Sequence, residues 1–537
     1  MNGADVMIKC LEKEGVDVVF GYPGVAICPF YNSILESDIK TVLIRTEQNA
    51  AHAANGLARV TGKVGVCAVT SGPGATNAIT GIATAFADSI PLVCITGQVE
   101  TNQLGSDVFQ ESDITGAAES FVKYSYLVKN AEEIPRIMKE AFYIANTGRK
   151  GPVLIDVPID VQNQEVSKFR YPEEIKMRSY KPTVKGNTVQ IHKVAKEIEK
   201  SKSPLICVGG GVFLSDAVAE VRSFVEKHEI PVVCTMMGIG FLPTEHPLFY
   251  GTVGNNGKPY ANKALKDSDL LIVVGARLAD RAISNADHLM KNKTLVHIDI
   301  DPCEIGKNTG AELPLVGDAK HIFEELLKEE ISCEHQLWID TLHLYKENMP
   351  KKRSVNKNYV DPAEFIKKLS YAMEDDAVYV ADVGQNQIWS CDYHVVKNGR
   401  YLTSGGMGTM GYSIPAAIGA KIGSPKRQVV AVCGDGAFQM SMMELATMRQ
   451  HGVDLKIVVL KNNVLGMVRQ YQHFTYKDNF SMIDLSGSPN LEKIAEAYEM
   501  PFIRLETMEG ADEAIWQLLL KEGSVLMECL VDPADLV

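Results

Sequence analysis

The stretch QVVAVCGDGAFQMSMMELATMRQHGVDLKIVVLKNN, residues 428–463, contains two β-branched runs on either side of a helical segment. Val429–Val432 and Lys456–Leu460 have the composition of buried strands, and Ser441–His451 has that of a helix. A strand, a helix and a second strand in this order form a unit whose two strands run parallel. We therefore expect an α/β fold around this stretch.

Two oxygen-bearing side chains follow these strands: Asp435 lies in the first turn, and Asn462 follows the second strand. Open α/β sheets bind ligands at the carboxyl ends of their strands, and neighbouring strands lie about 4.8 Å apart. Mg²⁺ takes oxygen ligands and completes its shell with water and phosphate. We expect Asp435, Asn462 and the carbonyl oxygen of Val464 to bind Mg²⁺.

Gly434 and Gly436 flank Asp435 and let the backbone approach a ligand closely. The N–H groups of Ala437 and Phe438 are then available to a phosphate at a helix N-terminus. Alone, Gly-Asp-Gly is equally consistent with an ordinary strand-to-helix turn in which the Asp caps the helix. The matched strand-helix-strand context, with Asn462 at the end of the second strand, favours the binding site.

The same alternation recurs along the whole chain. Runs typical of buried strands occur at Val18–Phe20, Thr41–Ile44, Val64–Val69, Leu92–Thr96, Val153–Val157, Leu205–Val208, Val232–Thr235, Leu270–Val274, Thr294–Ile298, Val378–Ala381 and Val525–Leu530. Helical segments such as Ala50–Arg59 and Pro135–Ala145 separate them, and polar stretches at 161–187 and 346–357 read as linkers. We expect three doubly wound parallel-sheet domains, 1–165, 187–340 and 360–537, of which the first and third could be structural relatives.

Composition narrows the class of protein. The 537 residues are 46% apolar and 23% charged, with a net charge of −13, which argues against a nucleic-acid partner. The eleven cysteines form no CxxC pair, and no stretch is long and apolar enough to span a membrane. The N-terminal segment has the pattern of an amphipathic helix rather than a signal peptide. These features predict a cytoplasmic protein.

Several motifs together give the chain a resemblance to a known family. Asp435 and Asn462 have the spacing of thiamine-diphosphate enzymes. The segments FGYPG, TSGPGATN, PLVCITGQV, DVFQESDITG, GRKGPVLIDVP, TSGGMGTMGYSIPAAIGA and LGMVRQYQ resemble the catalytic (large) subunit of the acetolactate synthase family. The resemblance covers nearly the whole chain. It implies a transferase that decarboxylates pyruvate and joins the two-carbon unit to a second 2-oxo acid, pyruvate or 2-oxobutyrate, in branched-chain amino-acid biosynthesis.

The resemblance also implies roles for individual residues. The family's glutamate, here Glu47, hydrogen-bonds the cofactor's pyrimidine and promotes loss of its C2 proton; alone, a Glu in a first helical turn more often only complements the helix dipole. Met410 would hold the cofactor in its bent form, although a methionine here is also consistent with core packing. The remaining cofactor contacts implied are Gln385, Asn386 (where the family usually has His), Gly408, Gly436, Ala437 and Met467.

Substrate and partners are implied in the same way. Phe109 and Gln110 would line the substrate channel with Met467 and Tyr471, although Phe109, Met467 and Tyr471 are equally consistent with packing. The family's pyrimidine and diphosphate domains pair across subunits, which implies a homodimer or tetramer with the active site at the interface. A small regulatory subunit is also possible in this family.

The central domain is expected to bind FAD, which in the family is structural. Three glycines after a strand are weak evidence alone, because a tight turn explains them equally well. The residues implied by the resemblance are Arg149, Gly209, Gly210, Gly211, Thr235, Met236, Gly254, Arg277, Arg281 and Asp318.

Departures from the family pattern leave the second substrate open. They are Val25 in place of Gly, Ile159 in place of Lys, Tyr471 in place of Trp, Ala279 in place of Asp, Asn255-Asn256 in place of Met-His, and an end at VDPADLV without the family's tail. Three alternatives therefore stand beside acetolactate synthase. They are another thiamine-diphosphate carboligase, acyltransferase or decarboxylase with a different 2-oxo acid, a non-catalytic paralogue, and a flavin oxidase.

Overall fold

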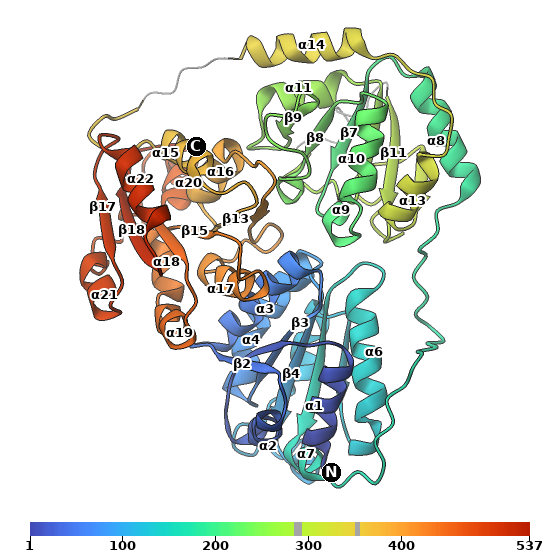
Figure 1. Ribbon diagram of the computed structural model, residues 1–537, viewed down its shortest axis with the longest axis vertical. Helices are drawn as coiled ribbons and strands as arrows, with labels where there is room; N and C mark the ends of the chain where they lie inside the picture. The colour runs from blue at the N-terminus through green and yellow to red at the C-terminus, as the bar shows by residue number, and fades with distance from the viewer. Residues whose placement is uncertain (284–292, 350–354) are drawn as a thin grey trace.

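The computed structural model describes residues 1–283, 293–349 and 355–537. Within these ranges the strands form three six-stranded sheets, and every strand pair of the three sheets is parallel (Figure 1). Helices cover the sheets on both faces. The predicted fold class, three doubly wound parallel-sheet domains, is confirmed.

The N-terminal sheet has the strand order β2-β1-β3-β4-β6-β5. Its strands are β1 Val18–Tyr22, β2 Lys40–Leu43, β3 Gly65–Val69, β4 Leu92–Gln98, β5 Tyr124–Leu127 and β6 Pro152–Pro158. Its helices are α1 Gly3–Lys13, α2 Cys28–Ser33, α3 Glu47–Thr61, α4 Pro73–Ala87, α5 Ile114–Ala118, α6 Ile134–Asn146 and α7 Ile159–Asn163. The inner strands β3, β4 and β6 are buried along their whole length, as expected for a sheet covered on both faces.

The central sheet has the order β12-β11-β10-β7-β8-β9. Its strands are β7 Pro204–Val208, β8 Val232–Cys234, β9 Phe249–Thr252, β10 Leu270–Val274, β11 Thr294–Asp299 and β12 Leu313–Val316. Its helices are α8 Thr188–Lys200, α9 Gly211–Leu214, α10 Val218–Lys227, α11 Pro259–Asp267, α13 Ala319–Leu326 and α14 Gln336–Glu347. Numbered within the domain, this is the 3-2-1-4-5-6 order of dinucleotide-binding folds.

The C-terminal sheet has the order β14-β13-β15-β16-β18-β17. Its strands are β13 Val378–Ala381, β14 Arg400–Leu402, β15 Val429–Gly434, β16 Lys456–Lys461, β17 Phe502–Leu505 and β18 Val525–Leu530. Its helices are α15 Pro362–Ala372, α16 Gln385–Tyr393, α17 Ser413–Gly423, α18 Asp435–Ser441, α19 Glu444–His451, α20 Gly466–Tyr476, α21 Leu491–Ala497 and α22 Ala511–Leu520. Strand for strand, the order equals that of the N-terminal sheet, so the two outer domains share one topology.

Helices α3 and α17 lie side by side where the two outer domains meet (Figure 1). A Cβ atom on Gly56 would lie 1.9 Å from the carbonyl oxygen of Ala416, and one on Gly419 would lie 1.8 Å from that of Ala53. Only glycine fits at either position. The backbones of the two helices therefore touch, and this contact fixes the N-terminal domain against the C-terminal one.

Some elements differ from the sequence prediction. The helix predicted at Ser441–His451 is a pair, α18 and α19, and the first of them already begins at Asp435. Gly436 lies in the first turn of α18, where glycine is tolerated because fewer hydrogen bonds depend on it. The strands β5, β9, β12, β14 and β17 were not predicted. All five lie at sheet edges, where strands are short and their burial pattern is mixed.

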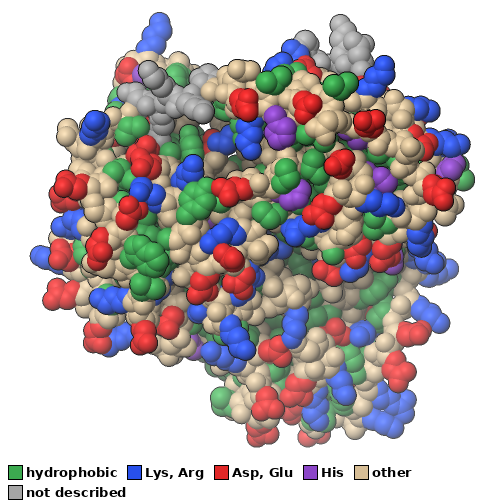
Figure 2. Space-filling model, turned by 45° about the horizontal axis from the view of Figure 1, so that its top comes forward, with side chains coloured by type: hydrophobic (Ala, Val, Ile, Leu, Met, Phe, Trp, Pro, Cys, Tyr) green, Lys and Arg blue, Asp and Glu red, His purple; other side chains and the backbone are tan. Residues whose placement is uncertain are grey.

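The surface drawn in Figure 2 carries acidic and basic side chains interspersed over the visible face. In the three described ranges of the chain, no helix combines the length and apolar character needed to cross a membrane.

Candidate active site

The C-terminal sheet has a switch point between β13 and β15. The connection from β13 leads to β14 on one side, whereas β15 and β16 lie on the other. Loops leaving the carboxyl ends of β13 and β15 therefore diverge, and a crevice opens between them where such sheets bind ligands. Helices α16 and α18 begin directly after these two strands, so their N-termini face this crevice.

The predicted metal ligands lie together at this edge. Gly434 of β15 pairs with Leu460 of β16, which places Asp435 and Asn462 at neighbouring strand ends. Asp435 Oδ2 accepts a hydrogen bond from the N–H of Asn463 at 2.9 Å, and Asn462 Oδ1 accepts one from the N–H of Val464 at 3.1 Å. The 462–464 turn is thus folded back toward Asp435.

Burial makes Asp435 a fitting cation ligand. Its side chain is 3% exposed, and burial raises the pKa of the carboxyl despite hydrogen bonds from nearby backbone N–H groups. A bound cation would offset this cost of ionisation. In the described residues no group of three His, Cys, Asp or Glu side chains could hold a metal. The oxygens at this edge are the Asp435 carboxylate and nearby amide and carbonyl groups, which Mg²⁺ accepts together with phosphate oxygens.

The start of α18 is closely packed. A Cβ atom on Gly436 would lie 3.2 Å from Leu465 and Leu485 and 3.4 Å from the terminal carbon of Met410. Met410 is therefore next to the Asp435 turn. Ala437 is buried, and the first N–H groups of α18 have no partner within the helix. The geometry fits a phosphate group at this turn.

Gln385 and Asn386 begin α16, after Gly384 with a φ of +105°. The Asn386 amide donates to the carbonyl oxygens of Asp382 at 3.0 Å and Val432 at 2.8 Å. Both of its hydrogens are thus used within the sheet end. A diphosphate contact at this helix would come from backbone N–H groups rather than from the Asn386 side chain.

The Gln385 amide is also engaged. It donates to Gln470 Oε1 at 3.1 Å and to the carbonyl oxygen of Asp535 at 2.8 Å, and its oxygen accepts from Asn462 at 3.5 Å. Gln470 in turn bonds the main chain of Val537 in both directions. The predicted metal ligand Asn462 is therefore connected through Gln385 to the last residues of the chain.

The loop 404–411, which contains Gly408 and Met410, is held from two sides. From its own domain, the buried Asp382 accepts the N–H of Gly411 at 3.0 Å and of Ser413 at 2.8 Å. Within the loop, Ser404 Oγ accepts the N–H of Thr409 at 3.0 Å. Burial raises the pKa of Asp382. This carboxylate fixes the end of the loop.

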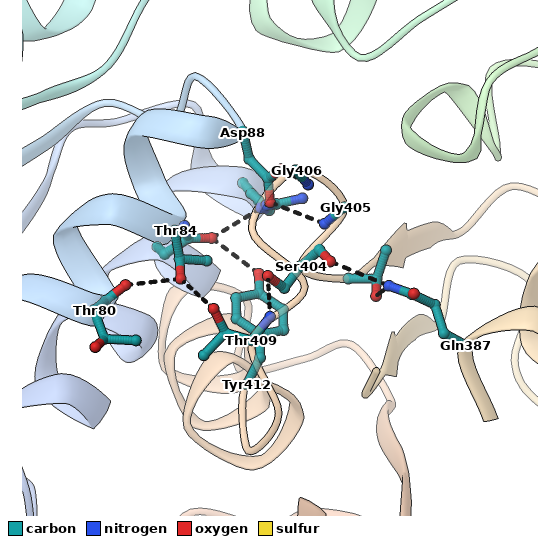
Figure 3. Close-up of polar contacts among 12 residues, drawn as sticks. Thr80, Thr84, Asp88, Gln387, Ser404, Gly405, Gly406, Thr409 and Tyr412 are labelled. Carbon is teal, nitrogen blue, oxygen red and sulfur yellow. Dashed lines mark hydrogen bonds and ion pairs between the residues drawn. The ribbon is translucent and has the colours of Figure 1, made fainter. Parts of the chain in front are cut away.

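The N-terminal domain holds the other side of the loop (Figure 3). Asp88, after α4, accepts the N–H of Gly406 at 2.7 Å and of Gly405 at 3.3 Å. It also pairs with Arg59 at 2.6 Å, and the two side chains are 0% and 5% exposed. Thr84 and Thr409 share a hydrogen bond of 2.8 Å between their hydroxyls. A buried ion pair of one domain thus positions the candidate cofactor loop of another.

Glu47 is the first residue of α3, and its Oε2 accepts a hydrogen bond from Asn77 at 3.1 Å. The start of α3 is anchored to the C-terminal domain by Glu444, which accepts the Asn49 amide at 2.9 Å and the Arg45 N–H at 3.0 Å. Glu47 is not among the described residues that line the large cavity next to Met410. One chain alone therefore does not bring Glu47 to that cavity.

Phe109 and Gln110 lie on an exposed loop of the N-terminal domain. Phe109 is 87% exposed, and Gln110 has a φ of +60°. The Gln98 amide holds the loop's end, because it donates to the carbonyl oxygen of Ser112 at 2.8 Å and to Asp156 at 2.9 Å. Burial raises the pKa of Asp156 to about 7.

A cavity of about 1320 Å³ lies among the three domains. This exceeds the roughly 300–1,000 Å³ typical of small-molecule sites. Most of the predicted flavin residues line it: Arg149, Gly210, Gly211, Thr235, Met236, Arg277, Arg281 and Asp318. Three residues predicted to contact thiamine diphosphate line it as well: Gly408, Met410 and Met467. Gly209 and Gly254 are not part of this lining.

The cavity follows the carboxyl edge of the central sheet. The glycine triplet directly follows β7, at the switch point of the dinucleotide-type strand order. A Cβ atom on Gly209 would lie 2.2 Å from the carbonyl oxygen of Gly275, which follows β10. The two turns are thus packed backbone to backbone. The cavity's size, its glycine-lined edge and this topology fit a dinucleotide.

Arg149 crosses from the N-terminal domain to the central one. Its guanidinium lies 2.7 Å from Glu304 Oε1 and 3.5 Å from Asp301 Oδ2. Burial and the neighbouring Asp301 and Glu304 contribute to raising the pKa of Asp299 to about 6. The end of β11 therefore gathers acidic groups, and Arg149 partly neutralises them.

Sequence reasoning did not identify several residues that shape the site: Arg59, Asp88, Asp156, Asp382, Arg400 and Glu444. Asp382 could have been identified from the sequence, because it directly follows a predicted strand in the same way as Asp435. The partners of the others lie far away in the sequence. Asp88 and Gly406, for example, are 318 positions apart.

Comparisons with known proteins agree with this arrangement. Family models described as the N-terminal TPP binding, central and C-terminal TPP binding domains of thiamine pyrophosphate enzymes match residues 1–117, 191–326 and 382–529. The chain is 41% identical to a probable acetolactate synthase large subunit of Methanocaldococcus jannaschii, over 100% of this chain and 93% of the relative. It is 40% identical to an acetolactate synthase large subunit of Lactococcus lactis subsp. lactis (99% and 93% covered) and 39% identical to one of Haemophilus influenzae (100% and 95% covered).

Proposed function

The chain belongs to the acetolactate synthase family of thiamine pyrophosphate enzymes, and on that premise we propose that it condenses pyruvate with a second 2-oxo acid. The reaction is a transfer: carbon dioxide leaves pyruvate, and the remaining two-carbon unit is joined to the carbonyl carbon of pyruvate or 2-oxobutyrate. The observation that carries the proposal is the meeting of Asp435, Asn462, Met410 and the starts of α16 and α18 at one switch point.

Thiamine diphosphate supplies the electron sink for decarboxylation when it is bound. Asp435, Asn462 and the carbonyl oxygen of Val464 are the proposed protein ligands of Mg²⁺, which would neutralise the diphosphate. The first-turn N–H groups at Gly436 and Ala437 would bind phosphate oxygens. The main chain at Gly408 and Met410 would hold the pyrimidine, and the Met410 side chain would keep water from the reacting carbon.

Glu47 is the proposed proton-handling residue. Its carboxyl group would donate a hydrogen bond to a ring nitrogen of the pyrimidine and, by giving that nitrogen its proton, assist proton loss from the reacting carbon. Asn77 already orients one of its oxygens. Because Glu47 does not line the cavity next to Met410 in its own chain, we place it in the active site of a second copy.

Exposed apolar side chains support this homodimer. Helix α20, beside the candidate metal turn, buries none of its residues within its own chain. Its Tyr471 and Phe474 are exposed, as is Met482 on the loop that follows it, and in the N-terminal domain Val25 and Phe109 are exposed as well. Large apolar surfaces of this kind mark interaction sites. A second copy that covers α20 would also bring Phe109 and Gln110 over the substrate.

We further propose that the central cavity holds FAD in a structural role. The support is its volume, the glycine triplet at the switch point and the cations Arg149, Arg277 and Arg281 along its wall. Relatives are named large subunits, so a small regulatory subunit is a proposed partner of this chain as well.

The test is product identification by mass spectrometry, with Mg²⁺ and thiamine diphosphate saturating. Pyruvate alone should give acetolactate, and added 2-oxobutyrate should give acetohydroxybutyrate. A chain that forms neither product yet turns over another 2-oxo acid would refute the substrate assignment. Unbleached flavin absorbance during turnover is expected, because net redox chemistry is absent from the proposed reaction.

The Glu47 assignment is tested separately. Glu47→Gln keeps the size of the side chain but cannot take a share of the proton, so activity should fall at least about 100-fold. Cofactor affinity should change far less. Glu36→Gln, at an exposed position of the same domain, is the control and should leave the rate unchanged. Wild-type activity of Glu47→Gln would refute the role.

A further inference from the structure

Arg400 is a cation inside the central cavity, and no motif pointed to it. It is the first residue of β14, the edge strand next to the switch point. Its guanidinium lies 3.9 Å from the centre of the Phe213 ring, in α9 of the central domain. Both residues line the cavity. Arg400 therefore reaches across the domain boundary into the proposed flavin site.

Its charge has no counter-ion in the described part of the chain. No carboxylate there pairs with Arg400, and its buried Nε has no hydrogen-bond partner. Burial above all, together with the charges of Arg59 and Arg427, which are also cations, lowers its pKa to about 10. Arg59 already pairs with Asp88, and Arg427 bonds the main chain of Asp376.

Packing on Phe213 does not compensate for this burial. A cation–π contact recovers only a small part of the lost hydration energy. Removing a charged group from water costs several kcal/mol unless a partner replaces the lost hydration. An arginine with free donors in a cavity wall is therefore poised to bind an acceptor that the chain itself does not supply. Its planar fork suits phosphate and paired oxygen acceptors.

We propose that Arg400 binds an anionic oxygen group of the dinucleotide in this cavity. This inference rests on the proposed flavin occupancy. Two parts of FAD carry such oxygens: the diphosphate, and the polar edge of the ring system, which becomes negative on reduction. Arg400 lines this cavity together with Gly210 and Gly211 of the central domain and Gly405 and Gly406 of the cofactor loop.

The experiment is a titration of apoprotein with FAD, followed by flavin fluorescence, for wild type, Arg400→Met and Arg400→Lys. Arg400→Met should raise the Kd at least tenfold, and Arg400→Lys about threefold or more, because lysine keeps the charge but loses the fork. Arg504→Gln is the matched control. It removes another arginine of the same domain that neither lines the cavity nor acts on Arg400, and should leave the Kd within twofold.

Titrations with riboflavin and ADP identify the acceptor, and either answer supports the proposal. Loss of affinity for FAD and ADP but not riboflavin assigns the phosphates, whereas equal loss for FAD and riboflavin assigns the ring edge. Wild-type FAD affinity in a folded Arg400→Met chain, judged by its circular dichroism, would overturn the role. If that variant does not fold, Arg400→Lys decides by the same criterion. Wild-type protein that binds no FAD would instead overturn the flavin assignment itself, and this inference with it.

Discussion

Replacing Asp88 with Asn is the sharpest test of how the cofactor loop is held. The substitution keeps the shape of the side chain but removes its charge. Asp88 is fully buried and lies 2.6 Å from Arg59, whose side chain is 5% exposed. Breaking a buried ion pair by removing one partner costs about 3–5 kcal/mol, because the remaining charge stays buried.

The loop is affected as well. Asp88 accepts two backbone N–H groups, those of Gly405 and Gly406, and an Asn amide has only one accepting oxygen for them and for Arg59. We therefore expect a loss of about 3–5 kcal/mol of unfolding free energy. We also expect at least tenfold weaker thiamine diphosphate binding, because Gly408 and Met410 belong to the same loop.

Urea unfolding and cofactor titration measure the two effects. Asp17→Asn is the matched control: Asp17 pairs with Lys63 on the surface of the same domain, and both side chains are mostly exposed. Surface pairs of this kind contribute little. The reasoning fails if Asp88→Asn shifts the urea midpoint no more than Asp17→Asn, or if it leaves cofactor affinity unchanged.

Three further predictions concern packing, acid stability and the metal. Gly56→Ala should lower the free energy of unfolding in urea by about 1–3 kcal/mol or more, because the added methyl collides with the main chain of α17. Gly487→Ala, with open space around it, should leave this free energy unchanged. Burial lowers the pKa of His52 to about 3. The imidazole of His52 therefore stays neutral in the folded protein, whereas in the unfolded chain it takes up a proton below about pH 6.5. Stability should therefore fall as the pH drops from 6.5 toward 3, by about 1.4 kcal/mol per unit for this group, and a shallower slope is expected in His52→Gln. Chelation should abolish activity and Mg²⁺ should restore it. Asp435→Asn should need at least tenfold more Mg²⁺, whereas Asp454→Asn, at an exposed position before β16, should behave as wild type. Equal Mg²⁺ requirements would contradict the assignment.

The sequence predicted the inner strands and the positions of Asp435 and Asn462 at their ends well. Runs such as Val429–Val432 and Lys456–Leu460 are buried on both faces, so their composition is decided by the fold itself. Asp435 and Asn462 were placed correctly at neighbouring strand ends, because strand direction and adjacency follow from the strand-helix-strand pattern. The prediction needed only local information.

The edge strands and the interdomain contacts could not be predicted from the sequence. Tyr124–Leu127 and Arg400–Leu402 are short and partly exposed, so neither periodicity nor a long apolar run distinguishes them from loops. Asp88 and Arg400 are single charges in unremarkable stretches of sequence. Their importance comes from what lies across a domain boundary, Gly406 in one case and Phe213 in the other. Only the three-dimensional arrangement gives that information.

The contact between α3 and α17 has a regularity that bears on the origin of the chain. Each helix connects the second and third strands of its own domain, and the two domains have the same strand order. Gly56 meets Ala416, and Gly419 meets Ala53, so the partners in each helix are three residues apart and the pairing is reciprocal. Such self-complementary pairing is the mark of a two-fold symmetric homodimer. The outer domains are thus related as two subunits would be, which is the arrangement left when a gene encoding a symmetric dimer duplicates, fuses and diverges.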